Sequence, residues 1–190
     1  SVLAALESQF APSLSMHHFC GKTFPTLRDD TEVQALLATI AQQADRLGID
    51  VNRVSLMGHS AGGHLAAFVA AQASALPVQA VFAISGVFDL VPLIPTSLNK
   101  ALTLDEQRAD ALSPVLQAGP TGTRMHTIIG ELETAQFHLQ AAVMANCWPQ
   151  VVAHHVVPQT HHYTVLFPLA DGNSPVCRAV IAEIGDAGRR

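Results

Sequence analysis

The stretch Val54-Ser55-Leu56-Met57-Gly58-His59-Ser60-Ala61-Gly62-Gly63 decides the fold of this chain. At its centre, Ser60 occupies the serine position of a Gly-x-Ser-x-Gly motif. Residues 51–57 predict a strand, and residues from about 61 to 73 predict a helix. The pentapeptide by itself also fits a plain turn. A strand directly before it and a helix directly after it favour a nucleophile elbow, with Ser60 as the nucleophile position.

The glycines around Ser60 have a physical purpose in such an elbow. A strand and a helix that meet in so tight a turn need small residues where they approach each other, and Gly58, Gly62 and Gly63 supply them. The turn lifts the serine hydroxyl out of the sheet and directs the backbone N–H of Ala61 at a developing oxyanion. We therefore expect Ala61 to contribute one oxyanion donor.

The rest of the chain alternates short β-rich runs with helical runs. Helices are expected at residues 1–10, 31–47, 133–146 and 174–184, and strands at residues 13–19, 79–84, 124–129 and 151–157. Thr31 and Gln34 form a capping box, and Thr103 and Glu106 form a second one before a short helix. This alternation predicts one α/β domain over residues 1–190. Its mostly parallel sheet has about five strands, with helices on both faces.

The composition is that of a folded protein without a nucleic-acid or membrane partner. Apolar residues make up 49% and charged residues 13% of the 190 positions, and the net charge is −5. Nucleic-acid binding needs clustered Lys and Arg side chains, which the sequence lacks. The longest apolar stretch, around residues 65–71, is far shorter than the roughly 20 residues that span a bilayer. We therefore expect a small-molecule substrate, with neither nucleic acid nor membrane as a partner.

The cysteines and the first residues of the chain indicate the cellular compartment in which the protein is expected. Three cysteines, Cys20, Cys147 and Cys177, are widely spaced and form no CxxC pair or disulfide framework, which favours a reducing compartment. Residues 1–7 have neither the basic region nor the apolar core of a signal peptide. We expect a cytoplasmic protein. The choice between a monomer and a homodimer stays open.

A serine nucleophile needs a histidine base and an acid that orients it, in the chain order serine, acid, histidine. The acid should follow the strand at residues 124–129, where both Glu131 and Glu133 occur. These two glutamates are two positions apart, so we expect only one of them to face the site. Asp89, after the preceding strand, is a third candidate, which we expect to cap or brace a loop instead.

The histidine should follow the last strand, at residues 151–157. His161 and His162 lie just beyond it, whereas His154 and His155 lie within it, one on each face, and are expected to pack. Ten histidines in the chain raise the question of a metal. Neither an HExxH pattern nor Cys/His ligand spacing is present, so we expect no metal site.

Beyond the elbow, several stretches resemble the kynurenine formamidase (arylformamidase) branch of the α/β-hydrolases. They are Gly58–Leu65, Ile84–Leu90, Ala111–Pro114, Gly130–His138 and His162–Leu166. Many esterases share the elbow, whereas the joint set in this order is much more specific. The resemblance runs from about residue 51 to the C-terminus and implies the α/β-hydrolase fold.

The resemblance implies hydrolysis of N-formylkynurenine to kynurenine and formate without a cofactor. In family members the acid is the fourth residue of a Gly-x-x-Asp-[Ser/Thr]-x-x-Phe stretch, which places it at Glu133, with Phe137 in register. The family histidine precedes an aromatic residue, which selects His162. The implied catalytic residues are thus Ser60, Glu133 and His162. Glu133 replaces the usual Asp, and Leu139 replaces a common Arg.

One feature of the family is missing. Its members carry a His-Gly-Gly motif upstream that supplies further oxyanion donors, and no such motif precedes Ser60. We therefore expect an N-terminally truncated member, in which the strands at 13–19 and 51–57 either pair directly or leave an edge exposed. Because removing one oxyanion donor costs about 10²–10³ in kcat, we expect a weakened activity. The alternatives are a general carboxylesterase and a non-catalytic domain of the same fold.

Overall fold

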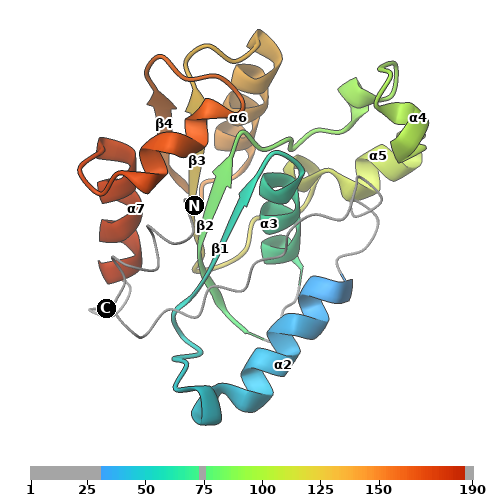
Figure 1. Ribbon diagram of the computed structural model, residues 1–190. Helices are drawn as coiled ribbons and strands as arrows, with labels where there is room; N and C mark the ends of the chain where they lie inside the picture. The colour runs from blue at the N-terminus through green and yellow to red at the C-terminus, as the bar shows by residue number, and fades with distance from the viewer. Residues whose placement is uncertain (1–30, 73–75, 187–190) are drawn as a thin grey trace.

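The computed structural model describes residues 31–72 and 76–186 and contains, within them, one sheet of four parallel strands (Figure 1). In the order of the sequence, these strands are β1 (Val54–His59), β2 (Val78–Ile84), β3 (Arg124–Gly130) and β4 (Val151–Val157). The predicted α/β class with a parallel sheet is confirmed. The helix expected at 1–10 and the strand expected at 13–19 lie outside the described residues.

Helices cover both faces of this sheet, as predicted (Figure 1). On one face lie α3 (Ala61–Ala71) and α6 (Ala135–Cys147), and on the other lie η4 (Thr164–Ala170) and α7 (Pro175–Asp186). Successive residues of a strand point to opposite faces. Accordingly, Val81 of β2 packs in the first layer and Phe82 in the second, and both are fully buried. None of the helices within the described residues combines the length and apolarity that a bilayer span requires.

The segment before the sheet folds largely as the sequence predicts. Helix α2 spans Thr31–Leu47, the predicted range. Strand β1 begins three residues later than expected because Asp50 starts a turn. The Asp50 carboxylate accepts the N–H of Asn52 at 3.0 Å, and its carbonyl accepts the N–H of Arg53 at 3.0 Å. Residues held in this turn cannot join the strand.

The irregular segment between β2 and β3 contains four short helices. They are η2 (Val91–Leu93), α4 (Asn99–Leu102), α5 (Glu106–Leu112) and η3 (Pro114–Leu116). The capping box predicted at Thr103 is wrong. Asp105 caps α5, because its carboxylate accepts the N–H of Arg108 at 2.8 Å. Thr103 instead ends α4 in a left-handed conformation with φ 50°.

The elbow between β1 and α3 leaves no room for a side chain at its first glycine. A Cβ on Gly58 would lie 2.1 Å from the carbonyl oxygen of Gly62, far inside van der Waals contact. A Cβ on Gly63 would lie 3.0 Å from the Cα of Gly86. In contrast, a Cβ on Gly62 would have no neighbour within 4 Å. The predicted close approach of strand and helix therefore depends on Gly58 and Gly63.

Gly58→Ala is expected to destabilise the protein by about 3 kcal/mol or more, because the new methyl group meets backbone atoms that cannot move aside independently. Gly62→Ala is the matched control. It adds the same methyl group to open space in a helix, where alanine is favoured over glycine by roughly 0.5–1 kcal/mol. Urea unfolding of both variants measures the difference. Equal free energies of unfolding would contradict the packing described for Gly58.

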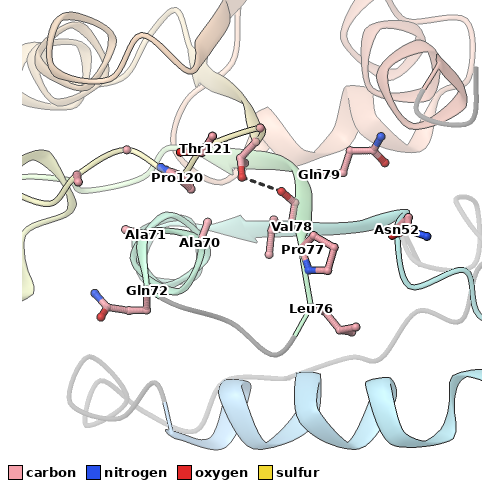
Figure 2. A pocket seen from close by; sticks show the side chains of 14 residues that line it. Asn52, Ala70, Ala71, Gln72, Leu76, Pro77, Val78, Gln79, Pro120 and Thr121 are labelled. Carbon is pink, nitrogen blue, oxygen red and sulfur yellow. Dashed lines mark hydrogen bonds between the residues drawn. The ribbon is translucent and has the colours of Figure 1, made fainter. Parts of the chain in front are cut away.

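A hollow of about 640 Å³ lies at the amino ends of β2 and β3, at the sheet edge opposite Ser60 (Figure 2). Thr123 donates a hydrogen bond from its hydroxyl to the carbonyl of Val78 there, at 2.7 Å. The described lining contains neither charged side chains nor histidine, cysteine or serine. In open parallel sheets, ligands bind outside the carboxyl ends of the strands. A reactive site is therefore expected at the other edge of the sheet, near Ser60.

Candidate active site

Ser60 stands between β1 and α3 in a strained backbone conformation. Its φ of 56° and ψ of −118° lie in the positive-φ region that residues other than glycine rarely adopt. Its N–H donates to the carbonyl of Ile84 at 2.8 Å, and its own carbonyl accepts the N–H groups of Gly63 at 2.9 Å and His64 at 3.1 Å. These bonds stabilise a conformation of a kind that clusters at functional sites. Ala61 begins α3, so the helix leaves its N–H without an intrahelical partner.

Glu133 and His162 are brought together at the same edge of the sheet. The Nδ1–H of His162 donates to Oε2 of Glu133 at 2.9 Å. The Glu133 side chain is fully buried, and its other oxygen, Oε1, accepts the N–H of Gly130 at 2.9 Å and the hydroxyl of Ser85 at 2.5 Å. Both carboxylate oxygens are therefore satisfied. Their position holds the His162 ring with its Nε2 turned away from the acid.

The other acid candidates make different contacts. Glu131 is exposed, and its Oε2 accepts the N–H of Gln159 at 2.8 Å, so it braces the loop after β4. Asp89 accepts the N–H of Val91 at 3.0 Å through Oδ1, in the loop-bracing role predicted for it. Between the two glutamates that the sequence leaves open, the structure joins Glu133 alone to His162.

The remaining histidines of this region contact residues other than Ser60 and Glu133. His161 is exposed, and its Nδ1 accepts the N–H of Tyr163 at 3.3 Å. His154 is hydrogen-bonded to the hydroxyl of Thr127 at 2.8 Å. His155 lies 3.1 Å from the ring nitrogen of His126. Since His126 and Thr127 alternate along β3, the paired histidines point to opposite faces of the sheet, as predicted. Within residues 31–72 and 76–186, no group of three or more possible ligands could hold a metal ion.

His162 contacts the elbow through His59, a residue that the sequence analysis did not single out. The Nε2–H of His59, next to Ser60, donates to the carbonyl oxygen of His162 at 2.7 Å. The rings of His59 and Phe137 each lie 4.6 Å from that of His162, centroid to centroid. Among the described residues, the Ser60 hydroxyl itself makes no hydrogen bond. Such catalytic bonds often tighten only in the complex with substrate.

Ser85 is the second contributor that no sequence pattern assigned to the site. It follows β2 with φ 48° and is buried, and its N–H donates to the carbonyl of Ile128 at 2.7 Å. This strained backbone aims its hydroxyl at Glu133. A positive φ at serine has no signature in the sequence, because it is imposed by the neighbouring strands.

A cavity of about 270 Å³ opens beside Ser60. It is bounded by the elbow, the segment 87–98 and the start of α6, and its lining carries no charged side chain. His64, which also lines it, is buried and donates from Nε2 to the carbonyl of Leu112 at 2.8 Å. Burial lowers the pKa of His64 from 6.5 to about 4, so this ring is neutral at physiological pH. The cavity therefore suits uncharged, largely apolar groups.

The pattern of the alpha/beta hydrolase fold matches residues 20–153, which is more than half of the chain. This chain belongs to the α/β-hydrolase fold family. The elbow and the parallel sheet are the features that this α/β-hydrolase shares with the general scheme of the fold. The matched range ends before His162, whose place follows from the structure.

Individual relatives of this α/β-hydrolase agree with the resemblance seen in its sequence. Kynurenine formamidase from Salmo salar is 24% identical over 169 residues, which cover 82% of this chain and 56% of that relative. The chain therefore spans little more than half the length of that protein. This similarity confirms the resemblance to kynurenine formamidases.

Solved structures show the same fold. A thioesterase candidate from Silicibacter sp. TM1040 superposes with a TM-score of 0.62 and 29% identity, covering 80% of this chain and 58% of the other. Esterase B from Lactobacillus rhamnosis superposes with a TM-score of 0.67 and 17% identity, covering 88% and 65%. At 17% identity, esterase B supports the fold alone.

Proposed function

We propose that this α/β-hydrolase is a serine hydrolase that cleaves the formamide of N-formylkynurenine to kynurenine and formate. In this proposal Ser60 is the nucleophile, His162 the general base and Glu133 the orienting acid. The observation that carries it is the 2.9 Å hydrogen bond between His162 and the buried Glu133, at the sheet edge where Ser60 stands in its strained elbow. The similarity to a kynurenine formamidase supports the choice of substrate.

The chemistry proposed for these groups is acyl transfer. The Nε2 of His162 takes the hydroxyl proton as Ser60 Oγ attacks the formyl carbonyl, and Glu133 stabilises the imidazolium that forms. The N–H of Ala61 donates to the oxyanion of the tetrahedral intermediate. His162 then protonates the leaving arylamine. Water, activated by the same base, hydrolyses the formyl ester on Ser60 and releases formate.

The uncharged cavity favours a second candidate, a carboxylesterase of the same mechanism. N-formylkynurenine carries an ammonium and a carboxylate on its alanyl side chain, and no described residue of the cavity supplies a charge to pair with either. Burying an unpaired charge is costly, so this side chain would have to extend into solvent. A neutral ester or a neutral arylformamide would have no such constraint.

Parallel assays of the purified chain separate these candidates. The substrates are N-formylkynurenine, the neutral formamide formanilide and the ester p-nitrophenyl acetate, with a fluorophosphonate probe to label the active serine. A formamidase is expected to turn over N-formylkynurenine with the highest kcat/KM. A preference for formanilide over N-formylkynurenine would support a formamidase whose substrate is neutral. Turnover of the ester alone supports the carboxylesterase, and no labelling with no turnover supports a non-catalytic domain.

A further inference from the structure

His59 links the two halves of the candidate site. It is the last residue of β1, directly before Ser60, and its Nε2 lies 2.7 Å from the carbonyl oxygen of His162, 103 positions later in the chain. Its ring also packs against the imidazole of His162, with a centroid distance of 4.6 Å and an interplanar angle of 44°. One side chain therefore contacts both the main chain and the ring of His162.

This contact joins two segments that follow well-separated strands of the sheet. His162 follows β4 and Ser60 follows β1, and β2 and β3 lie between these strands. Three strand spacings put the ends of β1 and β4 roughly 14 Å apart, so the loop after β4 must fold back over the edge of the sheet. The bond to Glu133 orients the ring of His162 but leaves the position of its main chain to other contacts. His59 supplies such a contact from the elbow itself.

We propose that His59 is a positioning residue, which holds the main chain of His162 against the elbow and thereby sets the distance from its Nε2 to Ser60. The inference rests on the proposed function of the Ser60 site. A carbonyl oxygen only accepts hydrogen bonds, so the Nε2 of His59 must carry the proton. Together, the bond to Glu133 and the bond to His59 determine where the free Nε2 of His162 lies.

The protonation of His59 is compatible with this role. Burial lowers the pKa of His59 below its ordinary 6.5, and the positive charge of a protonated His162 lowers it further. The bond to the His162 carbonyl and the charge of Glu133 act in the opposite direction. The net effect lowers the pKa and favours the neutral form of His59. A neutral ring donates one hydrogen bond without repelling the imidazolium that forms on His162.

Two substitutions separate positioning from packing. His59→Leu removes the donor and is expected to lower kcat by about 10²-fold with little change in KM, because displacements near 1 Å at a reacting group have costs of that size. His59→Gln keeps an N–H donor at a similar reach, and we expect kcat within about tenfold of wild type. His154→Leu is the matched control, since the His154 ring is hydrogen-bonded to Thr127, which is not part of the candidate site. It is expected to leave kcat unchanged.

NMR of histidine-labelled protein provides a readout that needs no turnover. In wild type and His59→Gln, the Nδ1–H of His162 should give one low-field resonance, at the same chemical shift in the two proteins. In His59→Leu, that resonance should broaden or disappear, because the ring is no longer held in one position. If wild-type protein neither labels with fluorophosphonate nor turns over substrate, the proposed function fails, and the NMR comparison still tests His59. The inference is overturned if His59→Leu matches wild type in the NMR readout. It is also overturned if the leucine and glutamine variants lose kcat to the same extent.

Discussion

Ser60→Ala is expected to lower kcat/KM by about 10⁴- to 10⁶-fold, the largest effect of any single substitution in this chain. In the proposed mechanism no other residue replaces the Ser60 hydroxyl as the nucleophile. Only the contributions of the oxyanion donor and of substrate binding to the rate would remain. Folding should be retained. Serine and alanine both carry a Cβ, and the strain of φ 56° is therefore similar for either residue.

Kinetics with the preferred substrate and fluorophosphonate labelling together measure this effect. Wild type should incorporate one equivalent of probe and Ser60→Ala none. Ser97→Ala, at an exposed serine in the segment between β2 and β3, is the control and should label like wild type. Equal turnover by wild type and Ser60→Ala would assign the activity to another group.

Glu133→Gln is expected to lower kcat by about 10³- to 10⁴-fold. The amide is almost the same size as the carboxylate, but it presents N–H donors where Glu133 now accepts three hydrogen bonds. If the amide nitrogen faces His162, the ring must turn or change its tautomer, and Nε2 then carries the proton that it should accept. The imidazolium also loses the adjacent negative charge that stabilises it.

Glu131→Gln is the matched control for this prediction. It makes the same chemical change two residues away, at an exposed carboxylate that accepts the N–H of Gln159. We expect its kcat to stay within about twofold of wild type, since surface substitutions of this kind usually have small effects. The kcat values and melting temperatures of both variants decide the comparison. A loss with Glu131→Gln that equals the loss with Glu133→Gln would show that neither carboxylate acts through His162.

Local patterns in the sequence predicted most of the fold. The sequence pattern placed α2 in the range that the structure gives it, and the glycines located the elbow, because these signals act within one turn or one strand. The errors arose where two local signals competed. Asp50 begins a turn that includes residues 51–53, and Asp105 rather than Thr103 caps the helix. In both places a nearby aspartate offers the backbone N–H a stronger local partner.

For the site, the sequence by itself determined that Ser60 stands in an elbow and that an acid and a histidine follow the last two strands. The family resemblance named Glu133, but only the tertiary structure showed that Glu133 rather than Glu131 contacts His162, because residues two apart in a loop can point either way until packing buries one of them. The parts played by Ser85 and His59 were likewise decided there. Each acts through a partner at least 48 positions away, at the common edge of a parallel sheet. No pattern along the chain encodes such a contact, since it exists only once the strands are assembled side by side.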